Sequence, residues 1–96
     1  MTLHQTGLFE TTNASKYLKQ LCKHFAHKVE VDYDDTRGQA QLPSGPCLLR
    51  ASDTCLHIEI SGPDEAGLKR ARGVVDSHLE RFAFREGFKT MTWANT

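Results

Sequence analysis

The sequence predicts one α+β domain, residues 1–96, with two helices packed on one face of a mostly antiparallel sheet. Two segments, 14–28 and 63–86, repeat apolar residues at three- and four-residue steps, the period of an amphipathic helix. Shorter segments around them alternate apolar and polar residues, the period of a half-buried strand. Helices segregated to one face of such a sheet form a two-layer sandwich, and ferredoxin-like folds belong to this class.

The N-terminal region predicts a strand followed by a helix. The stretch LHQTGLFE, which starts at Leu3, is strand-like, and Thr12 or Asn13 can cap the helix that follows. That helix, ASKYLKQLCKHFAHK, has one apolar stripe made of Ala14, Tyr17, Leu18, Leu21 and Phe25. Its other faces carry lysines and no acid.

The middle of the chain predicts two hairpins. Residues 29–33 (VEVDY) and 39–42 (QAQL) alternate on either side of the turn-like DDTRG. The segment PSGP then breaks the pattern. Residues 47–61 give a second hairpin, CLLRA and CLHIEIS joined by SDT, whose inward residues are Leu56, Ile58 and Ile60.

The C-terminal third predicts a helix and a last strand. Pro63 suits the first helical position, and Asp64 and Glu65 favour the positive end of the helix dipole. The apolar stripe of this helix consists of Leu68, Ala71, Val75, Leu79 and Phe82. Glycines at 67 and 73 indicate close packing, Gly87 suits a C-terminal cap, and FKTMTW (88–93) is strand-like. The predicted order is β-α-β-β-β-β-α-β.

Composition narrows the class of protein. The formal charge is zero, whereas a dedicated nucleic-acid binder usually carries a basic excess, so we expect no nucleic-acid partner. No apolar run is long enough to span a bilayer, and the N-terminus lacks the apolar core of a signal peptide. The three cysteines form no Cys-x-x-Cys pair, which fits reduced thiols. We therefore expect a cytoplasmic domain that contacts no membrane.

Histidines beside the two apolar stripes are the candidate ligand-binding residues. At 100° per residue, His24 and His27 lie on one flank of the first helix, and His78 lies on the flank of the same hand on the second. If these flanks face each other, all three line one groove together with Arg81 and Arg85; if they face outward, they form two separate surfaces. His24-x-x-His27 with His78 could bind a metal ion, the one cofactor the sequence suggests. Exposed histidines near a helix C-terminus are the alternative.

Two arginines and a phenylalanine follow on the second helix. Arg81 and Arg85 are four residues apart and could both reach an anion, because guanidinium groups match carboxylate and phosphate oxygens. A solvated basic edge is the alternative. Phe84 falls opposite the apolar stripe, so an exposed Phe84 would indicate a protein interface, such as a homodimer.

Catalytic motifs are not found in the sequence. It contains no Gly-x-Ser-x-Gly, phosphate-binding loop or dinucleotide fingerprint. Cys22 and His24 point about 160° apart on a helix, so they cannot act as a nucleophile and its base within it. The sequence therefore leaves enzymatic activity uncertain and favours a non-enzymatic protein.

Two motifs carry a resemblance to a known family. The helix NASKYLKQLCKHFAHK and the nonapeptide HLERFAFRE resemble those of a family of small bacterial proteins of unknown function, DUF 2218. The resemblance covers nearly the whole chain. Its characteristic positions correspond here to Lys23, His24, His27, Lys28, His78, Arg81, Phe82, Phe84, Arg85 and Glu86. Phe25 stands where the family usually has tryptophan, which removes an indole N–H donor.

The resemblance implies an accessory role in iron acquisition, because such proteins are often encoded near siderophore-interacting flavoproteins. Together with the histidine flank, it predicts a binding module for an anionic small molecule or a ferric siderophore. His24, His27 and His78 would be ligands or hydrogen-bond donors, and Arg81 and Arg85 would hold acidic groups. The alternatives are a module that docks a reductase partner or a second copy, and a small enzyme with a histidine-based site.

Overall fold

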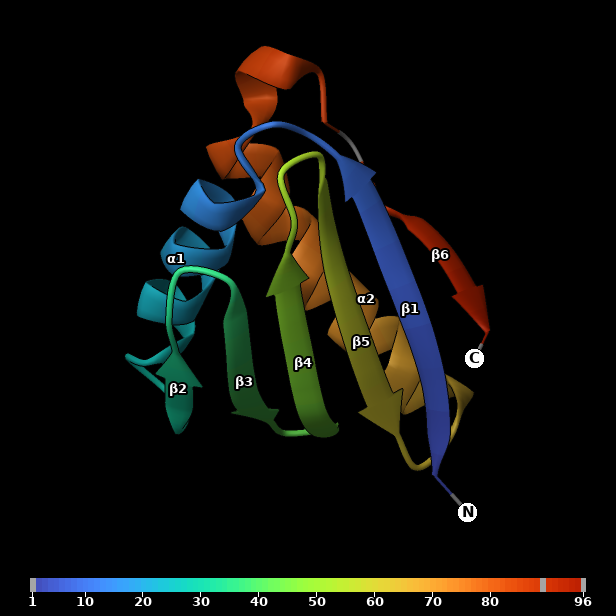
Figure 1. Cartoon of the computed structure of the whole chain (residues 1–96). Coiled ribbons are helices and arrows are strands. Elements are labelled where there is room, and N and C mark those ends of the chain that lie inside the picture. The colour runs from blue at the N-terminus through green and yellow to red at the C-terminus, as the bar shows by residue number, and fades with distance from the viewer. Residues whose placement is uncertain (1, 89, 96) are drawn as a thin grey trace.

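The computed structural model describes residues 2–88 and 90–95, and its elements follow the predicted order (Figure 1). The strands are β1 (Leu3–Glu10), β2 (Val31–Tyr33), β3 (Arg37–Leu42), β4 (Gly45–Ala51), β5 (Cys55–Gly62) and β6 (Thr92–Asn95). The helices are α1 (Ala14–Phe25), α2 (Glu65–Phe82) and a 3-10 turn, η1 (Phe84–Glu86). The predicted two-layer α+β class is confirmed.

All six strands form one antiparallel sheet in the order β2-β3-β4-β5-β1-β6. Strands β2 to β5 follow one another as hairpins, whereas β1 is inserted between β5 and β6. Each helix therefore crosses between two parallel strands that are not neighbours: α1 joins β1 to β2, and α2 joins β5 to β6. Figure 1 shows both helices behind the same face of the sheet. Within residues 2–88 and 90–95, the other face carries no helix.

The core lies between this face and the two helices. Both predicted helical stripes and the inward residues of β5 are buried, including Leu21, Ile58 and Leu79 at 0% exposure. The predicted Phe82 is only partly buried. Phe88 and Met91, which follow η1, complete the core at its C-terminal end. Burial of this apolar surface is the main favourable term in folding.

The first helix is shorter than predicted. It ends at Phe25, and residues 26–28 form turns in which the amide of Lys28 bonds the Phe25 carbonyl (3.0 Å). Asn13 is the N-cap, as one of the two predicted candidates, but its side chain makes no capping hydrogen bond. Instead, the Asn13 amide donates to Thr11 Oγ1 (3.1 Å).

The second helix differs from the prediction at both ends. Asp64, not Pro63, defines the start, because its carboxylate accepts the amide of Gly67 (2.8 Å) as an N-cap. The α-helix ends at Phe82, four residues before the predicted end. The chain then tightens into η1, and Gly87 with φ of 72° caps that turn rather than the helix. Glycine suits this left-handed conformation.

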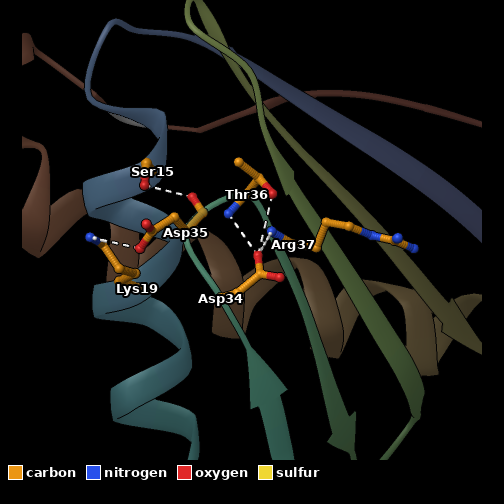
Figure 2. Close-up of polar contacts among 6 residues, drawn as sticks. All are labelled: Ser15, Lys19, Asp34, Asp35, Thr36 and Arg37. Carbon is orange, nitrogen blue, oxygen red and sulfur yellow. Dashed lines mark hydrogen bonds and ion pairs between the residues drawn. The ribbon is translucent and has the colours of Figure 1, made fainter.

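The turn between β2 and β3 is fixed by side-chain hydrogen bonds (Figure 2). Asp34 Oδ1 accepts the backbone amides of Thr36 and Arg37, both at 2.9 Å, and these bonds hold the pKa of this carboxyl below its usual value. Ser15 Oγ donates to the Asp35 carbonyl (2.6 Å), which joins the turn to α1. Strand β2 begins at Val31, two residues later than predicted.

The last strand is also displaced from its predicted position. Residues 88–93 were expected to form it, but β6 spans Thr92–Asn95 and Lys89 lies outside the described residues. Asp76 of α2 anchors this segment: its carboxylate accepts Thr90 Oγ1 (2.7 Å), the Met91 amide (3.1 Å) and Trp93 Nε1 (3.0 Å). In residues 2–88 and 90–95, no helix is long and apolar enough to cross a membrane.

Candidate ligand-binding site between the helices

The structure brings the three predicted histidines together. The ring centroids of His24 on α1 and His78 on α2 are 4.4 Å apart, and those of His24 and His27 are 6.3 Å apart. The like-handed flanks of the two helices thus face each other, which is one of the two arrangements that the helical period allowed. His24 lies at the centre of this histidine cluster (His24, His27 and His78). His24 and His27 are exposed, and His78 is half-buried.

The orientation of His78 is fixed by its own helix. Its Nδ1 atom lies 2.6 Å from the carbonyl oxygen of Val74, one turn earlier. Because a carbonyl can only accept, Nδ1 carries the proton and donates it. In the neutral ring, Nε2 is then left with its lone pair, so His78 can accept a hydrogen bond or bind a metal through that atom.

Aromatic side chains support the cluster from below. The ring of Phe25, which is 5% exposed, meets His78 edge-on at a centroid distance of 5.5 Å. The ring of Phe82 lies 6.2 Å from His24 and 6.5 Å from His78. Phenylalanine offers no hydrogen bond to the imidazoles, so their free nitrogen atoms remain available to solvent or to a ligand.

The charges around the cluster are positive. The pKa of His24 lies below its ordinary 6.5, first because of partial desolvation and then because His78, His27, Arg81 and Lys28 oppose its protonation. These neighbours come from α2 and from the turn after α1. A negatively charged ligand would relieve their mutual repulsion.

The two predicted arginines occupy different elements. Arg81 lies in the last turn of α2, close enough to His24 to affect its protonation. Arg85 lies in η1 and not in α2, so the prediction that it follows Arg81 one turn later on the same helix is wrong. That both arginines bind one anion stays a prediction. The Arg85 guanidinium instead lies over the ring of Phe84, 5.8 Å from its centroid. Phe84 is 65% exposed, as expected of an interface residue.

A bare metal ion is not favoured by the geometry of the side chains. Among the residues that the structure describes, no group of three or more His, Cys, Asp or Glu side chains is arranged to hold one. The three-histidine metal site therefore stays a prediction. What the structure shows is a set of imidazoles beside Arg81, a combination suited to hydrogen bonds with anionic oxygen atoms.

A second polar cluster, which the sequence did not predict, surrounds Glu86. Its carboxylate accepts hydrogen bonds from the Tyr17 hydroxyl, Thr11 Oγ1 (2.7 Å) and Asn13 Nδ2 (3.3 Å). The bond from Tyr17 is the main reason that the pKa of Glu86 is lowered. Burial and then the Glu86 contact raise the pKa of Tyr17. This cluster fastens η1 to the start of α1.

The only sequence signal for that cluster is that Asn13 and Tyr17 lie in one resembling motif and Glu86 lies in the other. Nothing in the residue types or their spacing indicates a contact across 69 positions. The residues of the motif HLERFAFRE thus have two different roles. His78 and Arg81 lie at the histidine cluster, whereas Glu86 joins η1 to the start of α1 through hydrogen bonds.

The cysteines do not add a nucleophile to the site. Burial raises the pKa of the Cys22 thiol to about 11 and that of Cys47 to about 12, which disfavours the reactive thiolate. Cys22 is fully buried, whereas His24 is exposed, so the two side chains point to different environments as predicted.

Comparison with known proteins identifies the family but no activity. The profile of DUF2218, described as "Uncharacterized protein conserved in bacteria", matches residues 6–94. The fold is similar to the NMR structure of PA4090 from Pseudomonas aeruginosa, with 32% sequence identity and a TM-score of 0.78. That similarity covers 96% of this chain and 95% of the other. No curated protein matches. Both helices and all six strands lie largely within the matched residues, and the chain therefore belongs to the DUF2218 family of bacterial proteins.

Proposed function

We propose that the chain is a non-enzymatic binding module that holds an anionic metal chelate, such as a ferric siderophore, against the histidine cluster. The observation that carries the proposal is the contact between His24 and His78 across the two helices, at 4.4 Å between ring centroids. Two imidazoles this close repel each other when protonated, so their proximity is unfavourable for the isolated protein at low pH. A negatively charged ligand that accepts hydrogen bonds from both rings in their protonated form, including His78 through Nε2, offsets that cost.

A chelate fits the cluster better than a free metal ion. A chelated ion already has its ligands, so the protein needs only to contact the negatively charged oxygen atoms around it. The N–H groups of His24 and His27 and the guanidinium of Arg81 can donate to such oxygens. The partly buried ring of Phe82, 6.2 Å from His24, suits contact with the flat ring of a catecholate. Arg85, beyond the end of α2, would contact only the outer part of the ligand.

The test compares the binding of a metal chelate with that of the free chelator and of a free metal ion. Isothermal titration with a negatively charged ferric catecholate, with the catecholate alone and with Zn²⁺ would be made on the wild type, His78→Gln and Arg81→Ala/Arg85→Ala. We expect the ferric complex to bind the wild type, and each variant to lose roughly tenfold or more in affinity, as for a lost charge-assisted hydrogen bond. His4→Gln, at an exposed position of β1 outside the histidine cluster, is the matched control.

Equal affinity of the ferric complex for the wild type and both variants would contradict the proposal. Binding of Zn²⁺ without binding of the chelate would replace it with the three-histidine metal site. The circular dichroism spectra of the variants should match the wild type, because the side chains of His78 and Arg81 lie outside the fully buried core.

A second candidate function rests on Phe84. This side chain is 65% exposed at the surface of η1, and exposed aromatic residues are favoured interface anchors. In this case η1 would dock a reductase partner or a second copy of the chain. Light scattering across a concentration series tests the homodimer, and Phe84→Ser should abolish any dimer that is found.

A further inference from the structure

Three basic side chains lie in one row on the face of the sheet that carries no helix. The strand register pairs Arg37 of β3 with Arg50 of β4, and Arg50 with His57 of β5. Directly paired residues of neighbouring strands point to the same face. On β4 and β5, Leu49, Leu56 and Ile58 point into the core, so Arg50 and His57 point away from it. We call Arg37, Arg50 and His57 the basic row.

This row is electrostatically unfavourable without a partner. Like charges directly opposite each other on adjacent strands destabilise a sheet. Among residues 2–88 and 90–95, the ion pairs within 4.0 Å are His4 with Glu59 and Lys19 with Asp35. Neither arginine of the row takes part in one.

Two of the acidic groups near the row, Asp34 and Glu59, already have partners. Asp34 Oδ1 accepts the backbone amides of Thr36 and Arg37, and Figure 2 shows the Arg37 side chain extending away from this carboxylate. Glu59, the one acid that lines the same depression of the sheet, lies 3.6 Å from His4 Nδ1. Both acids weaken the positive field of the row, as does Asp32 of β2, which lines a neighbouring depression with Arg37 and Arg50.

The row borders a shallow depression of the size that small ligands occupy. Its volume is 380 Å³, and it is lined by all three residues of the row and by the hydroxyl-bearing Thr6, Thr36 and Ser52. Leu48 forms an apolar part of the wall and is 43% exposed. The depression therefore offers positive charge and hydroxyl groups, with Leu48 and Ala51 as apolar contacts and Glu59 as its acidic group.

We infer that this depression binds a small molecule that carries a phosphate or carboxylate group, at a site separate from the histidine cluster. The guanidinium groups of Arg37 and Arg50 can each donate two hydrogen bonds to such an oxyanion, and His57 can donate a third contact from the next strand. The sheet separates this site from the helices. The inference thus does not rest on the function proposed for the histidine cluster.

The experiment is an amide NMR titration with pyrophosphate, with citrate and with sodium chloride at equal ionic strength. Pyrophosphate carries only phosphate oxygens and citrate only carboxylates and a hydroxyl, so the two arms separate the two chemistries. We expect saturable shifts for at least one of them, confined to residues 36–37, 50–52 and 57, and no saturable shift with chloride.

Substitutions test whether the basic row is responsible for the binding of pyrophosphate or citrate. Arg37→Gln/Arg50→Gln should weaken binding by roughly tenfold or more. Arg70→Gln, an exposed arginine on α2, should bind as the wild type does. Because the two arginines repel each other, the double variant should keep its fold, which its remaining amide shifts would show. Identical shifts with chloride, or unchanged binding by the double variant, would overturn the inference.

Discussion

At the scale of single residues, the charges of Glu86 and His24 affect the stability of this fold in opposite directions. Glu86 accepts three hydrogen bonds from residues at the start of α1, so its charge is stabilised by folding. His24 is surrounded by His78, His27, Arg81 and Lys28, so its charge is opposed by folding. Each therefore predicts a distinct dependence of stability on pH.

Glu86→Gln should lower the free energy of unfolding by about 1–2 kcal/mol at neutral pH, because a neutral amide replaces the charged acceptor of the Tyr17 and Thr11 bonds. The pKa of Glu86 is lowered in the folded state, so its contribution is present above the ordinary value of 4.5 and lost as pH falls through the folded value. The free energies of unfolding of the wild type and of Glu86→Gln should therefore become equal in acid. Urea denaturation at neutral and at acidic pH measures both values, with Glu80→Gln on the exposed face of α2 as the control. The same difference in free energy at the two pH values would contradict this prediction.

His24→Gln should make stability less sensitive to mild acid. The pKa of His24 is lower in the folded state than its ordinary 6.5, so the folded protein binds fewer protons than the unfolded one as pH falls through that range. Wild-type stability should therefore decrease from about pH 7.5 to about pH 5.5, and this variant should lose part of that decrease. Thermal denaturation across the range gives the comparison. Parallel curves for the two proteins would show that the neighbouring charges do not act on His24.

At the scale of elements, the two glycines of α2 should respond in opposite ways to alanine. A Cβ atom at Gly73 would meet nothing within 4 Å, so Gly73→Ala should raise the free energy of unfolding by about 1 kcal/mol through helix propensity. A Cβ atom at Gly67 would lie 2.9 Å from Pro63 Cδ and 3.5 Å from the Gly62 Cα atom. Gly67→Ala should therefore be destabilising. Urea denaturation measures both variants, and each serves as the control for the other. Equal changes in the free energy of unfolding would contradict this prediction.

The sequence predicted the type and order of the elements but not all of their ends. The periodic stripes and alternating segments identify helices and strands because they reflect which side of each element is buried. The end of α2 at Phe82 could not be predicted in this way, since Phe82 continues the stripe and Gly87 is a plausible cap. The chain tightens into η1, where the carboxylate of Glu86 is held by Tyr17 and Thr11. Such a contact depends on the tertiary structure.

At the scale of the whole molecule, the strand order was the part of the fold that the sequence left open. Alternation indicates which face of a strand is buried but not which strand lies beside it. The insertion of β1 between β5 and β6 depends on pairing between residues near the two ends of the chain, such as Gly7 with Trp93. That pairing is tight, because a Cβ atom at Gly7 would lie 2.8 Å from the Trp93 ring.

The candidate site was predictable in part for a related reason. The helical period placed the three histidines on like-handed flanks, but it left open whether these flanks face each other. Packing of α1 and α2 on the same face of the sheet settles the geometry and brings His24 to 4.4 Å from His78. The basic row on the opposite face was not predicted, because it appears only once the register pairs Arg37 with Arg50.

The measurement that tests the proposed function most directly is a histidine ring NMR spectrum recorded during titration with a negatively charged gallium(III) catecholate, a diamagnetic substitute for the ferric complex. If the histidine cluster is the binding site, the resonances of His24, His27 and His78 should shift together and saturate, while that of His4 stays unchanged. Equal shifts at all five rings, or none, would contradict the proposal that the histidine cluster is a ligand-binding site.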